Sequence, residues 1–248
     1  AGNEGDSGGH ARPVIVPGRI AEVRLSVGNY ETGFGVQIWK NYEDGMRIFL
    51  RDPFGDAEFE LLPIRGTDRI RIGETELLIY YGEPSPFNAA QEIYIEFVPE
   101  QAYVESGIWI FRFLGKGRED TYVDLWLPSS AALGQNTAFL EPSPETTLTI
   151  PSTAFRPLTV GAYDSRTGIY APFSGRGDTR IYHAQKPDLA APGVGIMAPK
   201  SGGGYEAVTG TSFAAPLVAG AAALLMEWGI VRGNDPYLYG EKVKAYLR

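Results

Sequence analysis

The stretch Gly210-Thr211-Ser212-Phe213-Ala214-Ala215-Pro216 decides how this chain folds. It runs directly into an apolar segment ending near Trp228, where large side chains recur at helical spacing and alanine and glycine fill the opposite side. We expect a helix with Thr211 or Ser212 as its N-cap, buried against a sheet. A serine there has its hydroxyl and backbone N–H at the positive end of the helix dipole, which suits a nucleophile.

An ordinary helix cap is the simplest interpretation of a Thr-Ser pair before a helix. The surrounding residues favour a second one, because Gly-Thr-Ser-Phe-Ala-Ala-Pro followed by a small-residue helix resembles the nucleophile motif of the subtilisin-like serine proteases, the subtilases. The resemblance implies that Ser212 attacks a peptide carbonyl and forms an acyl-enzyme.

The first ten residues are rich in glycine and predict a loop, in which an asparagine is usually a turn former. However, Ala-Gly-Asn-Glu-Gly resembles the subtilase segment whose asparagine donates to the oxyanion. The resemblance makes Asn3 the side-chain donor and the backbone N–H of Ser212 the second donor. In subtilases the same loop forms a wall of the substrate pocket, so Ala1, Gly2 and Glu4 are candidate substrate-binding residues.

Apolar and polar residues alternate between about Val14 and Pro144, with many β-branched and aromatic side chains. This period of two is typical of strands separated by turns. An antiparallel β-sandwich or jelly roll with its own core is therefore predicted. At least two of its three tryptophans are expected in that core. The expected strands lie near residues 23–27, 36–39, 47–50, 58–62, 69–72, 76–81, 93–97, 108–113 and 122–127.

Three later segments resemble subtilase segments in the family's order: the strand ending in Val160-Gly161-Ala162, the turn Phe173-Ser174-Gly175, and the run Pro187 to Gly193. The implied fold is α/β, a partial subtilisin-like parallel sheet with helices, plus the inserted antiparallel β domain. An insertion between the asparagine and the serine is similar to that of spore-germination-type subtilases. The resemblance implies a subtilase segment with the oxyanion loop at 1–13, the insertion at 14–147 and a C-terminal subtilase segment at 148–248.

The family's triad runs aspartate, histidine, serine along the chain, and its first two members precede the oxyanion asparagine. Neither the family's Asp-Ser-Gly segment nor its His-Gly-Thr-His segment stands before Asn3 in this sequence, and the two histidines, His10 and His183, lie outside such motifs. Both are interpreted as surface or packing residues. We therefore expect a fragment that is inactive alone and whose partner is the upstream part of the same protease, with the aspartate and histidine.

Charge and composition indicate which partners and cofactors are expected. The formal net charge is -8 with acids and bases mixed, so neither nucleic acid nor an anionic membrane is an expected partner. There is no cysteine, and no apolar run is expected to reach the length that spans a bilayer. No Asp-x-Asp-x-Asp calcium loop occurs, and no metal or cofactor is expected. The resemblance implies peptide or protein substrates and an extracytoplasmic or spore-associated bacterial setting.

A function from another class is a non-catalytic binding module, in which the β insertion carries the function and the subtilase segments serve as scaffold. The presence of both Ser212 and Asn3 argues for the endopeptidase, because a scaffold without catalysis has no chemical need for an oxyanion asparagine beside a serine.

Overall fold

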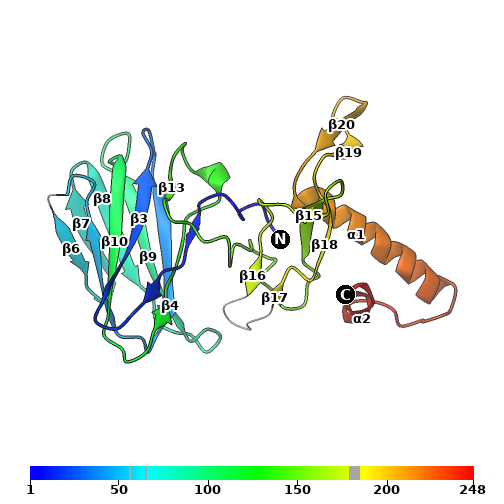
Figure 1. The fold of residues 1–248 in the computed structure, drawn as a ribbon, viewed down its shortest axis with the longest axis horizontal. Helices are drawn as coiled ribbons and strands as arrows, with labels where there is room; N and C mark the ends of the chain where they lie inside the picture. The colour runs from blue at the N-terminus through cyan, green and yellow to red at the C-terminus, as the bar shows by residue number, and fades with distance from the viewer. Residues whose placement is uncertain (56, 65, 179–184) are drawn as a thin grey trace. The chain divides into compact units, whose positions relative to one another are not determined.

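A computed structural model describes residues 1–55, 57–64, 66–178 and 185–248. Two compact units make up the chain (Figure 1). One unit joins Ala1–Asp6 to Pro144–Arg248, and the other is Ser7–Ser143. The first six residues therefore fold with the C-terminal part of the chain rather than with the residues that follow them.

Two antiparallel sheets form the Ser7–Ser143 unit, in the orders β1-β12-β4-β9-β8-β7 and β13-β3-β10-β5-β6, with β11 and β2 paired separately. Every expected strand region overlaps an observed strand, so those predictions are confirmed. The elements are β1 (His10–Ala11), β2 (Val14–Ile15), β3 (Ile20–Val27), β4 (Phe34–Asn41), β5 (Met46–Arg51), β6 (Glu58–Leu61), β7 (Thr67–Ile72), β8 (Thr75–Tyr81), β9 (Ala90–Pro99), β10 (Gly107–Gly115), β11 (Thr121–Tyr122), β12 (Asp124–Trp126), the 3₁₀ turn η1 (Ser130–Ala132) and β13 (Ala138–Phe139).

Alternate side chains of both sheets meet in one aromatic and aliphatic core. Phe97 of β9 meets Trp109 of β10 edge to face, with ring centroids 5.1 Å apart. Trp109 is fully buried, but Trp39 and Trp126 are only partly buried, so the expectation of two core tryptophans is wrong. Trp126 instead stacks on His10, which lies in β1 rather than in the expected loop.

A small mixed sheet organises the other unit, in the order β15-β14-β18. β14 and β18 are parallel, with Gly161 opposite Ala190, and β15 is antiparallel to β14. The helix α1 packs on β14 and β18 (Figure 1). The elements are β14 (Val160–Asp164), β15 (Ile169–Tyr170), β16 (Gly177–Asp178), β17 (Gln185–Lys186), β18 (Leu189–Pro192), β19 (Ile196–Pro199), β20 (Tyr205–Val208), α1 (Thr211–Met226), the π-helical turn η2 (Glu227–Val231) and α2 (Glu241–Leu247).

Helix α1 begins at the expected place but differs from expectation in two ways. Its N-cap is Gly210, which has no side chain, rather than Thr211 or Ser212. It is also largely exposed, because only Thr211, Ala214 and Val218 on its sheet-facing side are buried. The described sheet covers only this narrow side, so Leu224 on another side is 69% exposed.

The helix continues through η2, so its apolar segment is longer than expected from the sequence. Residues Thr211–Val231 form a 21-residue helix that is long and apolar enough, by length and composition, to cross a membrane. Only 17% of its apolar window is buried. Core helices of soluble proteins also reach this length and hydropathy. In α1, Ala214 and Val218 are buried against the sheet.

Candidate active site

The side chain of Asn3 lies at the start of α1, although 208 residues separate it from its partner there. Its Oδ1 accepts hydrogen bonds from the backbone N–H and from the hydroxyl of Thr211, both at 3.0 Å. Since Oδ1 has two donors, the amide orientation is fixed and Nδ2 is the group that remains to donate. Asn3 thus supplies the helix cap that Gly210 lacks, from a distant part of the chain.

The backbone of the first turn leaves one donor free. The first N–H groups of an α-helix have no partner inside the helix. Here the N–H of Thr211 donates to Asn3, and that of Phe213 donates to the Gly210 carbonyl at 3.1 Å. The N–H and the hydroxyl of Ser212 have no hydrogen-bond partner within the described residues, and Ser212 is exposed. The free groups therefore belong to the residue singled out as a nucleophile.

Glycines let the backbone segments of the site approach one another. A Cβ added to Gly210 would lie 3.3 Å from Asn3 Nδ2, and Gly210 has a φ of 150° that favours glycine. A Cβ on Gly193, just after β18, would lie 2.6 Å from the Cβ of Ala162 and 3.1 Å from the Gly210 carbonyl oxygen. The N–H of Gly210 donates to the Gly193 carbonyl at 2.8 Å. Larger residues here would push α1 away from the sheet.

The loop that carries Asn3 is tied into the same unit by its backbone. The Ala1 amine donates to the Val160 carbonyl at 2.8 Å, and the Gly2 carbonyl accepts from Gly175 at 3.0 Å. Gly2 has a φ of 87°, and an added Cβ would lie 2.4 Å from Thr149 Oγ1. These contacts hold the loop in place. Ala1, Gly2 and Glu4 are partly buried, and their role in binding substrate stays a prediction.

The predicted turn Phe173-Ser174-Gly175 is hydrogen-bonded to β14. Ser174 is fully buried, and its Oγ accepts from the N–H of Ala162 at 3.0 Å while donating to the Tyr170 hydroxyl at 2.8 Å. That hydroxyl in turn donates to the Gly175 carbonyl at 2.8 Å. Burial raises the pKa of Tyr170, so it stays a neutral donor at neutral pH. This chain of bonds fixes the strand beneath α1.

Neither histidine is identified as a base for Ser212. His10 belongs to the Ser7–Ser143 unit and is buried, with Nε2 3.0 Å from Asp124 Oδ1 and Nδ1 3.3 Å from the Ser143 carbonyl oxygen. Both ring nitrogens therefore have partners, as expected of a packing residue. His183 lies outside the described residues. No group of histidine, aspartate and glutamate that could hold a metal occurs among the described residues.

The part played by Thr211 was not predicted from the sequence, in which Thr211 is only a possible cap. Thr211 is buried, and both its N–H and its hydroxyl hold Asn3. The available signal was its position directly before Ser212, but nothing local in the sequence pairs it with Asn3.

Comparisons with known proteins point to one family. Residues 129–247 match the subtilase family. The structure of the Clostridium perfringens CspB protease superposes on the chain with a TM-score of 0.90 at 34% sequence identity, covering 100% of this chain. The resemblance to the subtilisin-like serine proteases is confirmed.

The chain is also similar to parts of curated relatives. It is 34% identical to the serine protease AprX of Bacillus subtilis (strain 168) over 122 residues, which are 41% of this chain and 26% of AprX. It is 49% identical to the subtilisin-like protease SBT3.16 of Arabidopsis thaliana over 57 residues, 22% of this chain and 8% of that protein. The chain covers 51% of CspB, so it spans about half of that subtilase and about a quarter of AprX.

Proposed function

We propose that this chain is the part of a subtilisin-like serine endopeptidase that carries the nucleophile Ser212 and the oxyanion donor Asn3. The observation that carries the proposal is the pair of hydrogen bonds from Thr211 to Asn3 Oδ1, which holds the Asn3 side chain beside the residue adjoining Ser212. A plain helix cap explains these two bonds. It does not explain why an exposed serine with a free N–H follows directly.

In the proposed reaction, Ser212 Oγ attacks the carbonyl carbon of the scissile peptide and loses its proton to a histidine. Negative charge then collects on the former carbonyl oxygen. The free Ser212 N–H and Asn3 Nδ2 donate to this oxygen, and the positive end of α1 adds to the stabilisation. Collapse of the intermediate releases the amine product and leaves an acyl-enzyme, which water hydrolyses.

The proposed partner of this chain is the preceding part of the same protease, which supplies the histidine and aspartate. The uncovered side of α1 supports it, because exposed apolar area of this kind marks an interaction surface. Leu217, Leu224 and Trp228 are 46%, 69% and 44% exposed. CspB, with the same fold across this chain, has almost as much chain again outside the match. Without that partner Ser212 is a protonated hydroxyl without a base, and we expect negligible hydrolysis.

The proposed domain organisation is a subtilase segment interrupted by an inserted β domain. The compact unit Ser7–Ser143 and the folding of Ala1–Asp6 with Pro144–Arg248 support it. The parallel pair β14 and β18 with α1 above it supports a partial subtilisin-like α/β layer. The jelly-roll topology of the insertion stays a prediction.

Labelling with a fluorophosphonate probe tests the proposed site. The chain alone is expected to label negligibly, and the chain expressed with the preceding part of its gene is expected to label at one serine. Ser212→Ala should abolish that labelling. Asn3→Asp keeps an acceptor for Thr211 but removes the donor, so it should lower kcat by about 10²–10³, the effect of losing such a donor in subtilisin itself, without unfolding the protein.

Two results would contradict the proposal. Strong labelling of Ser212 in the isolated chain would mean that a base is already present. Unchanged kcat in Asn3→Asp would mean that Asn3 is only a cap. Thr211→Val is the matched control, because it removes one bond to Asn3 Oδ1 and no oxyanion donor, so its loss of kcat should be much smaller.

A further inference from the structure

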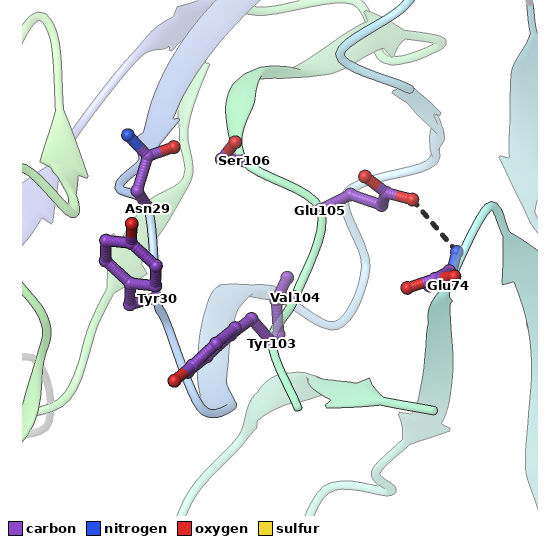
Figure 2. Close-up of a pocket in the computed structure, with 7 residues that line it drawn as sticks. All are labelled: Asn29, Tyr30, Glu74, Tyr103, Val104, Glu105 and Ser106. Atoms are coloured by element: carbon purple, nitrogen blue, oxygen red, sulfur yellow. Dashed lines mark hydrogen bonds between the residues drawn. The ribbon is translucent and has the colours of Figure 1, made fainter. Parts of the chain in front are cut away.

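A pocket of about 400 Å³ lies in the Ser7–Ser143 unit and shares no residue with the site around Ser212. Its polar and aromatic lining comes from three loops that approach one end of the sheets (Figure 2). One loop follows β3, one is the turn between β7 and β8, and one precedes β10. Its lining includes Asn29, Tyr30, Glu74, Tyr103, Glu105 and Ser106.

Two tyrosines form one wall of this pocket (Figure 2). Their rings meet edge to face with centroids 5.2 Å apart, and Tyr30 is 74% exposed while Tyr103 is 46% exposed. Tyr30 has a φ of 68°, a left-handed conformation that is uncommon for an aromatic residue. The next residue holds it there, because Glu31 is buried and its carbonyl accepts from the N–H of Val104 at 2.8 Å. Aromatic faces are thus fixed at the surface.

Two glutamates, Glu74 and Glu105, supply negative charge on the side of the pocket opposite the tyrosines (Figure 2). Glu105 Oε1 accepts from the N–H of Glu74 at 3.0 Å (Figure 2). Glu74 Oε1 accepts from the side-chain amide of Gln101 at 2.9 Å. The other oxygen of each carboxylate has no hydrogen bond within the described residues, and no lysine or arginine lines the pocket. On the neighbouring strand, Arg71 is already paired with Glu100.

The backbone holds Glu105 rigidly in this position. Its N–H donates to Thr75 Oγ1 at 2.8 Å, and its carbonyl accepts from the indole of Trp109 at 3.1 Å. Thr75 and Trp109 are both fully buried. Gly73 has a φ of 58° and makes room for the carboxylate, since an added Cβ would lie 2.4 Å from Glu105 Oε1. The charge is therefore preorganised rather than carried on a free side chain.

We propose that this pocket binds a basic side chain of a protein or peptide, through its guanidinium or ammonium group. Aromatic faces attract cations, and free carboxylate oxygens accept from them. The Asn29 amide and the Ser106 hydroxyl, which make no hydrogen bond among the described residues, supply further polar contacts. An anionic ligand would meet two unneutralised carboxylates. A neutral saccharide would use the tyrosines but would gain nothing from the net negative charge.

Titration of the full chain with N-acetyl-L-argininamide, followed by two-dimensional ¹⁵N NMR at low salt, tests this proposal. Saturable shifts are expected at the backbone amides of Tyr30, Tyr103 and Glu105. N-acetyl-L-citrullinamide, which has the same shape without the charge, should produce none. Binding should weaken strongly in 0.5 M NaCl, because salt screens exposed charges.

Substitutions identify the groups that bind. Tyr103→Ala should weaken binding about fivefold, and Glu74→Gln combined with Glu105→Gln about tenfold. After Glu105→Gln, the side-chain amide oxygen can still accept a hydrogen bond from the backbone N–H of residue 74. Tyr30→Gly removes a ring at a backbone angle that glycine adopts freely, so any loss of binding cannot come from strain. Tyr42→Ala, at another exposed tyrosine of the same unit, should leave binding unchanged.

The proposal is overturned if no saturable shift appears at the pocket, if the citrulline compound binds equally well, or if methyl β-D-glucopyranoside binds there and the arginine compound does not. None of these outcomes bears on Ser212, whose test is covalent labelling.

Discussion

At the scale of single residues, Asp188 is a buried carboxylate that pairs with two lysines. It pairs with Lys186 at 2.6 Å, and both side chains are only 2% exposed. Burial by itself raises the pKa of Asp188, but hydrogen bonds from Lys186, the Thr159 backbone and Lys244 outweigh it and hold that pKa below its ordinary value. Asp188→Asn should therefore lower the free energy of unfolding by about 3–5 kcal/mol at pH 7, because it leaves Lys186 buried without a counter-charge.

The sign of the pH dependence follows from the lowered pKa. The contribution of Asp188 is fully present above its unfolded-state pKa of about 3.9 and is lost as the pH falls through the folded-state value. The difference between wild type and Asp188→Asn, measured by urea unfolding from pH 7 to pH 2, should shrink only below about pH 4. Arg166→Ala breaks the exposed pair with Asp164 and should cost less than about 1 kcal/mol. Equal losses in both variants would contradict the role given to Asp188.

At the scale of elements, the two sides of α1 should respond differently to the same substitution. Ala214 is fully buried in a cluster with Ala162 and Val218, and the nearby Gly193 leaves no spare space. Ala214→Leu should lower the free energy of unfolding by about 1–3 kcal/mol through overpacking. Ala219→Leu, on the exposed side, should change it by less than about 0.5 kcal/mol. Urea unfolding followed by Trp228 fluorescence measures both, and matching values would mean that α1 is not packed as described.

At the scale of the whole molecule, the two units should unfold separately. The Ser7–Ser143 core contains large aromatic and aliphatic side chains, whereas the buried cluster of the other unit is made of alanines and valines. The smaller cluster should be lost at lower urea concentration, because it buries less apolar area. Trp228 reports this unit, and the other three tryptophans report Ser7–Ser143. Trp228→Phe should remove only the first fluorescence transition. Coincident transitions, or an isolated Ser7–Ser143 segment without cooperative thermal unfolding, would contradict this prediction.

Local pattern was enough to predict much of this protein. Alternation of apolar and polar residues predicted the strands of Ser7–Ser143, because successive side chains of a strand point to opposite faces of the sheet. The Gly-Thr-Ser stretch and the small residues after it predicted the start of α1 and the resemblance to the subtilases. The positions of Asn3 and Ser212 in the reaction, and the inserted domain, stay proposals that rest on those motifs.

Only the tertiary structure decided which groups meet. Asn3 caps α1 across 208 residues, His10 is buried against Asp124 instead of lying in a loop, and one narrow side of α1 is covered while Leu224 stays exposed. Periodicity fixes which residues share a face of an element, but the partner of that face depends on how the chain returns in space. The sequence by itself therefore determined the elements and the resemblance to the subtilases, and the packing of distant segments decided which donors near Ser212 were taken and which were left free.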